Sequence, residues 1–378
     1  MPAARGLAIV ALGLGAHYGL PSSTRAIEKL LKDRTAKDRS EIATAAMLHY
    51  QLNPSPRLGN LFHKLHSDKS EPMGVRARAA ELIPRISNDP KASLEALQYY
   101  LNCRYLELRR SAAMALGQLK HPLVLPRIMT AYELEEEPVT RGFILLAIAR
   151  QGGDIARDFL IKEAHKGKDK PLRAWAALAL GDLAGREDDK VARDALRKTK
   201  LQKADQGALW LTLGISHDTA SVPRLVAGLS RGRNPWTRSH AATALAMIGA
   251  EEGLTALRER CAKEKSEFVL GFLANAISTF GQPQDVDRLV TTLQESNNPQ
   301  LQSLMAVSLG YHGSEAALDG VFATLQSTST ASASRGAALE SLGLLLDRRP
   351  GLAMPVTYRR SNFGVLPGWA LPAIRTSL

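Results

Sequence analysis

The sequence is poor in the residues that mark many classes of protein. Phe, Trp and Tyr together make up 5% of its 378 residues, and it contains two cysteines, Cys103 and Cys261. So few cysteines imply no disulfide framework and are typical of a reducing compartment. No apolar run reaches the roughly 18 residues that are needed to cross a bilayer. Few aromatic residues among many Ala and Leu residues favour helices packed on helices over a sheet.

Signatures of catalysis are also missing from the sequence. There is no glycine-rich loop of the kind that holds a nucleotide phosphate, and nothing pairs a nucleophile with a base. His63 and His66 share one face of a predicted helix near Asp68, but two histidines without a clear third ligand favour a solvated helix face over a metal site. We therefore expect a protein that is not an enzyme, with no catalytic residues, metal, cofactor or small-molecule substrate.

What the sequence does contain is a pattern that recurs about every 32 residues. The stretch LRAWAALALGDLAG covers residues 172–185, and related stretches begin at Leu108 and Thr237. Aligned on the arginine, one column holds Arg5, Ile42, Arg76, Arg109, Arg141, Arg173, Gln206, Arg238, Leu270, Gln302 and Arg335. Eight residues further on, six of the eleven positions are glycine. A fixed period along the whole chain is the signature of a repeat architecture.

Each repeat unit is predicted to form two antiparallel helices. In the sixth unit we expect the first helix over about 171–183, a turn at AGREDD and the second helix over about 190–202. Pro84 falls in the glycine column of the third unit and should kink or end its helix. The sequence thus predicts an all-α solenoid of about eleven stacked helix pairs in residues 1–350. Residues 351–378 lack the repeat columns and are predicted to form a tail or cap.

The period, the paired helices and the pattern vRxxAAxALGxL resemble the short HEAT-like repeats found in phycobilin lyases. The resemblance covers nearly the whole chain and implies the solenoid fold. Related repeats serve as scaffolds, as lyase or chaperone subunits, as DNA glycosylases and as a diiron hydroxylase. The hydroxylase branch uses His-Glu dipeptides as iron ligands, and none of the nine histidines here precedes a glutamate. A glycosylase needs an aromatic-lined cleft, whereas Trp175, Trp210 and Trp236 lie at different offsets from the arginine column.

The arginine column is expected to be structural. The aliphatic stem of each arginine can pack on the next unit while its guanidinium binds a turn carbonyl or an aspartate. Since the same residue recurs in most units, a role in stacking accounts for the column better than ligand binding does.

The start of the chain has two interpretations. An apolar run over residues 7–16 follows Arg5, as in a signal peptide. However, Arg5, Ala8 and Gly13 all fall in the repeat columns, which favours the first helix of the first unit. We therefore expect a cytoplasmic protein, or an exported one if this stretch acts as a signal peptide.

Positive charge is concentrated in part of the chain. The net charge is +12, and residues 1–240 contain 38 Lys and Arg against 25 Asp and Glu, whereas residues 241–378 contain 11 against 12. Cations gather where the second helix ends in units five, six and seven. We call the following set the basic stripe: Lys166, Lys168, Lys170, Lys198, Lys200, Lys203, Arg231 and Arg233. Cations at helix C-termini stabilise the helix dipole by about 0.3–1 kcal/mol each, yet units nine and ten lack them there.

The predicted function is based on the basic stripe. We expect a non-catalytic scaffold or adaptor that presents an extended surface to a protein partner with an acidic surface. One alternative is a solenoid that binds nucleic acid along the stripe, and another is a lyase or chaperone subunit that needs a partner chain. Aromatic residues are almost absent between Lys162 and Arg233 outside the predicted core, which favours a protein partner over a nucleic acid.

Overall fold

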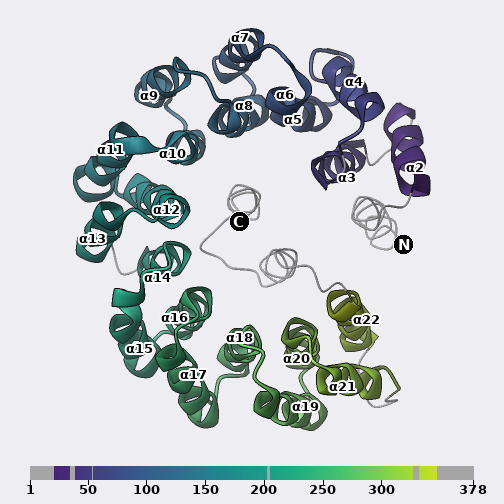
Figure 1. Ribbon diagram of the computed structural model, residues 1–378, viewed down its shortest axis with the longest axis vertical. Coiled ribbons are helices and arrows are strands. Elements are labelled where there is room, and N and C mark those ends of the chain that lie inside the picture. Colours follow the sequence, from purple (N-terminus) through teal and green to yellow (C-terminus); the bar gives the residue numbers. More distant parts are fainter. Residues whose placement is uncertain (1–20, 35–38, 53, 202–204, 327–331, 347–378) are drawn as a thin grey trace. The chain divides into compact units, whose positions relative to one another are not determined.

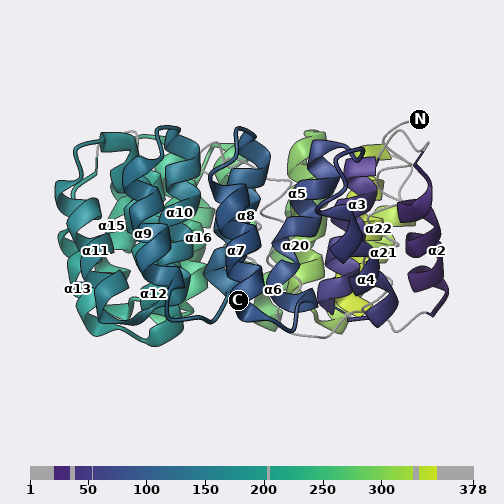
Figure 2. The ribbon, with the colours of Figure 1, turned by 90° about the horizontal axis from the view of Figure 1, so that it is seen from above.

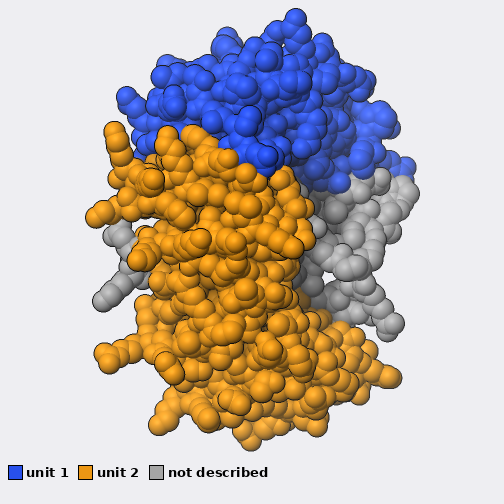
Figure 3. All heavy atoms as spheres, turned by 60° about the vertical axis from the view of Figure 1, so that its left-hand side comes forward, with its two compact units in different colours: residues 1–156 blue, residues 157–378 orange. Residues whose placement is uncertain are grey.

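The computed structural model describes residues 21–34, 39–52, 54–201, 205–326 and 332–346. Over these residues the regular structure is helical throughout, which confirms the prediction of an all-α solenoid. The chain divides into two compact units, Met1–Ala156 and Arg157–Leu378, which Figure 3 colours separately. The predicted first helix and the predicted tail lie outside the described residues, so both stay predictions, as do the predicted domain limits.

The first unit alternates between the first and the second helix of each repeat, here called helix A and helix B. The A helices pack on one another in sequence. Helix α8 also packs on α7, the helix B of the preceding repeat, and Figure 2 shows both helices upright. Its elements are α2 (Pro21–Lys32), α3 (Arg39–Leu52), α4 (Pro56–Leu65), α5 (Met73–Glu81), α6 (Ile83–Ile86), α7 (Pro90–Leu101), α8 (Leu106–Gln118), α9 (Val124–Leu134), α10 (Pro138–Gln151) and the start of α11 (Gly153–Lys166).

The second unit continues the same alternation. Figure 1 shows its A helices in one layer and its B helices in another. The A helices are α12 (Lys170–Glu187), α14 (Gln206–Ile215), α16 (Pro235–Ile248), α18 (Glu267–Ser278), α20 (Pro299–His312) and α22 (Ser332–Leu346). The B helices are α13 (Lys190–Lys198), α15 (Val222–Arg231), α17 (Glu251–Lys263), α19 (Val286–Glu295) and α21 (Glu315–Gln326), with short 3₁₀ turns η3 (Thr219–Ser221) and η4 (Pro283–Asp285) before α15 and α19. Nine complete pairs, from α3–α4 to α20–α21, lie within the described ranges.

Proline and small polar residues set the starts of many helices. Pro138, Pro235 and Pro299 each occupy the first position of an A helix, where the missing N–H costs nothing. Asn234 and Asn298 cap two of these helices by accepting hydrogen bonds from the first exposed backbone N–H groups. The start of each of these A helices is also the end of the loop that follows the preceding helix B.

Two local features differ from or refine the sequence-based picture. As predicted, Pro84 interrupts its helix: α5 ends at Glu81 and the short α6 holds Pro84 near its start. The predicted AGREDD turn, by contrast, is mostly helical, because α12 continues to Glu187 and ends at Asp188 in the left-handed conformation. The partner helix α13 is shorter than predicted and ends at Lys198.

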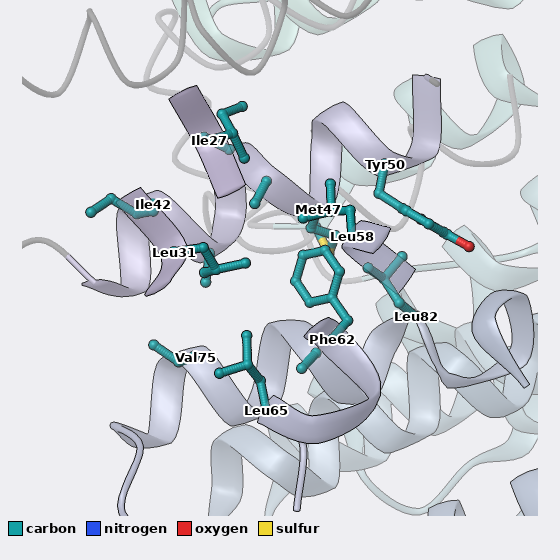
Figure 4. Close-up of a cluster of buried hydrophobic side chains, with 14 residues drawn as sticks. Ile27, Leu31, Ile42, Met47, Tyr50, Leu58, Phe62, Leu65, Val75 and Leu82 are labelled. Atoms are coloured by element: carbon teal, nitrogen blue, oxygen red, sulfur yellow. The ribbon is translucent and has the colours of Figure 1, made fainter. Parts of the chain in front are cut away.

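The core of each unit is a stripe of small and aliphatic side chains between the two helix layers. In the first unit Leu58 and Phe62 of α4 are fully buried against Met47 and Tyr50 of α3 (Figure 4). In the second unit a similar cluster forms around Met305 of α20. No helix pair could bury such a face alone, so each repeat depends on its neighbours.

The glycine column marks the places where consecutive A helices approach most closely. A Cβ on Gly181 of α12 would lie 2.5 Å from Cγ2 and 2.9 Å from the backbone oxygen of Thr212 in α14. A Cβ on Gly185 would lie 2.4 Å from the backbone oxygen of Ile215. Backbone atoms therefore set the spacing of α12 and α14, which is why no larger side chain fits there.

Candidate binding edge

The arginine column ties each A helix to the loop that precedes it. Arg238 Nη1 donates to the carbonyl oxygens of Gly232, at 2.9 Å, and of Arg233, at 3.3 Å. Equivalent bonds run from Arg173 Nε to Gly167, at 2.7 Å, and from Gln302 Nε2 to Ser296, at 2.8 Å. The acceptor lies six residues before the donor in all three. The predicted bond from the arginine head to a turn carbonyl is therefore observed.

Two arginines of the column also bind a carboxylate of the next loop. Arg238 Nε donates to Glu264 Oε2 at 2.9 Å, 26 residues further along the chain. Arg109 pairs with Glu135, again 26 residues on, with Nε and Oε2 2.8 Å apart. The carboxylates are glutamates rather than the predicted aspartates. One guanidinium thus fixes two successive loops to each other.

In the second repeat, the bond to the preceding loop is made by a different residue from the one predicted. The sequence alignment placed Ile42 in the column. Arg39 instead donates to the carbonyl oxygen of Asp33, six residues earlier, at 2.6 Å and pairs with the buried Glu71 at 2.5 Å. Ile42 is a fully buried core residue. The insertion that lengthens this repeat shifts the register by three residues.

The residues of the basic stripe lie at the ends of three successive B helices. Lys166, Lys198 and Arg231 are the last residues of α11, α13 and α15. Two residues further on, in the loops, lie Lys168, Lys200 and Arg233, and Lys170 begins α12. Lys203 is outside the described residues. The seven described cations are all exposed, and none of them forms an ion pair with a described acidic side chain.

Hydrogen bonds place the end of α11 beside the end of α13, and the end of α13 beside the start of α15. His165 of α11 contacts both the carbonyl oxygen of Ala195 and the hydroxyl of Thr199 at 3.0 Å, which joins the ends of α11 and α13. Between α13 and α15 the contact runs through the start of α15, since Arg224 Nη1 donates to the carbonyl oxygen of Arg197 at 3.0 Å.

The loops after α15 and α17 form a second adjacent pair. Arg238 binds the first loop through its carbonyl oxygens and the second through Glu264. That glutamate also accepts from the backbone N–H groups of Lys265 and Ser266 and from Arg260. Burial raises the pKa of Glu264, but these hydrogen bonds outweigh it and bring the pKa to about 2. The second loop is therefore held around a carboxylate that is charged at neutral pH.

The structure extends the row of cations by one unit that sequence analysis missed. Lys263 is the last residue of α17 and Lys265 lies two residues further on, and both are exposed. Their distances in sequence from Arg231 and Arg233 are 32 residues, the same as the repeat period. This spacing places them in the row. They were overlooked because the net charge of the residues after 240 is near zero, which hides two cations at repeat positions. One unit later, α19 ends with Glu295, so the row stops there.

An exposed aromatic pair lies next to these loops. Trp236, the second residue of α16, and Phe268, the second residue of α18, have ring centroids 4.6 Å apart and are 38% and 37% exposed. Beneath them lie the buried His240 and Phe272. Burial lowers the pKa of His240 to about 4, so this floor is uncharged at neutral pH. Sequence analysis compared the tryptophans only with one another and so missed the pair.

The other residues weighed from the sequence have structural partners. Trp210 is buried and Trp175 is half-buried. His66 Nδ1 lies 3.0 Å from the hydroxyl of Tyr100, and Asp68 accepts hydrogen bonds from Arg34 and Ser70. Among the described residues, no group of three His, Cys, Asp or Glu side chains is arranged to hold a metal ion. Nor does any described helix have the length and apolar character to cross a membrane.

Comparison with known proteins identifies the repeats. A family model described as HEAT repeats matches residues 94–181 and 222–303. The resemblance inferred from the sequence is thus confirmed, and these two regions consist of HEAT repeats. No curated protein matches it.

Two solved structures resemble the chain at low similarity. One is human deoxyhypusine hydroxylase in complex with glycerol, with 17% identity, a TM-score of 0.33, and coverage of 77% of this chain and 96% of that chain. The other is the complex of CpcE and CpcF of phycocyanin lyase from Nostoc sp. PCC7120, with 21% identity, a TM-score of 0.34, and coverage of 74% and 97%.

These structures correct one prediction made from the sequence. We predicted that the chain is not an enzyme, and that prediction is contradicted, because the two similar structures are those of a hydroxylase and of a lyase. At these TM-scores they assign no reaction to this chain. The prediction is therefore withdrawn, and the comparisons support a repeat scaffold.

Proposed function

We propose that this HEAT-repeat scaffold binds an acidic segment of a protein partner along the basic stripe. The observation that carries the proposal is the repetition of exposed cations without ion pairs at the same two positions of successive repeats, as in Lys166 and Lys168, Lys198 and Lys200, and Arg231 and Arg233. A row of like charges raises the rate of encounter with an oppositely charged partner.

The fold itself does not require these cations. B helices of the same unit end without them, since α19 ends with Glu295 and α21 with Gln326. Like charges near one another on a surface repel and weaken folding slightly. A series of unpaired lysines and arginines at neighbouring helix ends therefore supports binding rather than a contribution to stability.

The spacing of the repeats suggests the form of the partner. Packed helices lie about 8–10 Å apart, and an extended peptide advances about 3.3 Å per residue. An extended segment that crosses the helix ends would therefore meet a new pair of cations about every three residues. An acidic residue at every third position fits this spacing.

Nucleic acid is the second candidate ligand. Proteins that bind single strands without sequence preference combine cations with a succession of aromatic side chains on which bases stack. The exposed aromatic side chains of the described second unit are Trp236, Phe268 and Phe322. Trp236 and Phe268 border only the last loop of the stripe, and none of the three belongs to the loops after α11 and α13, so no succession of aromatic side chains follows the stripe. This arrangement favours the protein partner.

The experiment uses a labelled peptide of Glu-Gly-Ser repeats as an acidic probe and oligo(dT) as a nucleic-acid probe. The stripe variant carries Lys198→Glu, Lys200→Glu, Arg231→Glu and Arg233→Glu. Its matched control changes four exposed cations of the first unit that are likewise free of ion pairs: Lys64→Glu, Lys69→Glu, Lys91→Glu and Lys120→Glu. Both variants change the net charge equally.

We expect the wild-type chain and the control variant to bind the acidic peptide, more weakly as salt is raised, because exposed charges are screened over about 10 Å at 0.1 M salt. The stripe variant should lose binding while its thermal melt is nearly unchanged. Equal binding by both variants, or tighter binding of oligo(dT) than of the peptide, would overturn the proposal.

A further inference from the structure

The aromatic pair formed by Trp236 and Phe268 is not a requirement of the repeat. Each residue lies two positions before the arginine column of its unit, so the two are equivalent in successive repeats. The same position holds Pro171 in α12 and Gln300 in α20. Two large apolar side chains at this position in adjacent units, each more than one-third exposed, leave a local apolar surface open to water.

The surrounding contacts hold this pair rigidly. Asn234 caps α16 by accepting a hydrogen bond from the backbone N–H of Trp236 at 2.9 Å. The clamp from Arg238 to Glu264 holds the loop before α16 against the loop before α18. The rings also pack on a buried floor, since Trp236 stacks on His240 and Phe268 packs on Phe272. A site whose parts are fixed before binding loses little entropy when a ligand is bound.

Cations flank the pair on the loops that the clamp joins. Arg231 and Arg233 precede Trp236, and Lys263 and Lys265 precede Phe268, and all four are exposed. The exposed carboxylate nearby, Glu267, already accepts a hydrogen bond from Asn298 at 2.6 Å. An apolar centre with a cationic border complements an apolar side chain with acidic neighbours.

We propose that Trp236 and Phe268 form the anchor site of the binding edge and take one apolar side chain of an acidic peptide segment, whose carboxylates bind Arg233 and Lys265 on either side. The proposal rests on the proposed function, and it adds the chemistry that the partner must have. A few buried aromatic and arginine contacts commonly supply most of the affinity of an interface.

The arrangement of the rings favours a peptide over a nucleic acid. A stacked base needs a free ring face. One face of Trp236 is covered by His240, at an interplanar angle of 27°, and its ring meets that of Phe268 at 64°. Ring edges and two rings inclined at 64° to each other offer contacts to a branched aliphatic side chain.

The test compares two probes on the full chain: the Glu-Gly-Ser repeat peptide and the same peptide with one central glycine replaced by leucine. Wild-type protein should bind the leucine peptide about tenfold more tightly, the gain typical of one well-placed apolar anchor. A double variant, Trp236→Ala with Phe268→Ala, should bind both peptides with the affinity of the leucine-free one. Phe322→Ala removes an aromatic side chain that is 45% exposed on α21 and should keep the tenfold preference.

If the double variant does not fold, tryptophan fluorescence of the wild-type protein provides a second test. The leucine peptide contains no tryptophan, so its binding should shift the indole emission of the wild-type protein to shorter wavelength. Trp236→Phe keeps an aromatic ring at this position and should bind without that shift.

The outcomes separate this proposal from the one on which it depends. Equal affinity of the wild-type chain for the two peptides would overturn the anchor site and leave the basic stripe standing. Failure of both peptides to bind would overturn the proposed function itself. Oligo(dT) that binds more tightly than the leucine peptide, and that the double variant releases, would show a nucleic-acid site instead.

Discussion

Arg238 of α16 and Glu264, 26 residues later, form an ion pair of 2.9 Å with side chains that are 10% and 3% exposed. The same guanidinium donates to the carbonyl oxygen of Gly232. Two consecutive loops of the second unit are thus joined by one side chain. The cations of those loops, and the aromatic rings at the starts of α16 and α18, depend on this contact for their relative positions.

Removing the guanidinium should destabilise the second unit. Arg238→Met leaves Glu264 buried with only Arg260 as its cationic partner and frees the carbonyl oxygen of Gly232. Breaking a buried pair by removing one partner costs about 3 kcal/mol or more. Urea unfolding of the variant should show this loss, whereas Arg233→Met, at an exposed position, should stay within about 0.5 kcal/mol of wild type. Equal stability of the two variants would mean that Arg238 does not hold the loops.

The pH dependence of stability should report Glu264. Its pKa is about 2 in the folded chain, because hydrogen bonds from Ser266, Arg260 and Arg238 outweigh the effect of burial, and it is near 4.5 for an ordinary glutamate. The carboxylate therefore stabilises the fold fully above about pH 4.5, and that contribution is lost as the pH falls towards 2.

The variant Glu264→Gln cannot gain or lose this charge. Its free energy of unfolding should lie below that of wild type at pH 7, and the difference should narrow between pH 4.5 and pH 2. Thermal melting of both proteins between pH 2 and pH 4.5 separates the contribution of Glu264 from that of the other carboxylates, which the two proteins share. A difference that is the same at both ends of the range would rule out the lowered pKa.

Glycines where two A helices meet closely should be intolerant of a methyl group. Gly185→Ala would place a Cβ 2.4 Å from the backbone oxygen of Ile215, which a rotamer change cannot relieve. Overpacking of this kind costs about 1–3 kcal/mol. Gly336 of α22 is the matched control, since a Cβ there meets nothing within 4 Å. Gly336→Ala should keep or raise stability by up to about 1 kcal/mol, and thermal melting of the two variants would show whether the effects have opposite signs.

Sequence periodicity predicted the helix pairs and the role of the arginine column, because stacked repeats place equivalent residues in equivalent contacts. It failed at Arg39, where an insertion shifts the register and only the bond to Asp33 identifies the true equivalent. It also did not show that α12 continues beyond the predicted turn, since the end of that helix depends on a single left-handed residue, Asp188.

The candidate binding edge could be predicted in part. The cations of the basic stripe follow directly from the period, and Lys263 and Lys265 obey it too. The contact between Trp236 and Phe268 was harder to foresee, because the two residues differ in type and come together only through the clamp between their loops. The sequence pattern does not indicate how exposed a side chain at the start of a helix is, so it could not show that this pair lies at the surface rather than in the core.

The central claim is that the ends of the B helices in the second unit bind an acidic segment. Hydrogen exchange followed by mass spectrometry, with and without the leucine-bearing Glu-Gly-Ser peptide, locates the bound surface directly. We expect slower exchange in the loops around 166–170, 198–201, 231–234 and 263–266, and no change in α4 or α7 of the first unit. Protection confined to the first unit, or none in these four loops while the peptide is bound, would contradict the account.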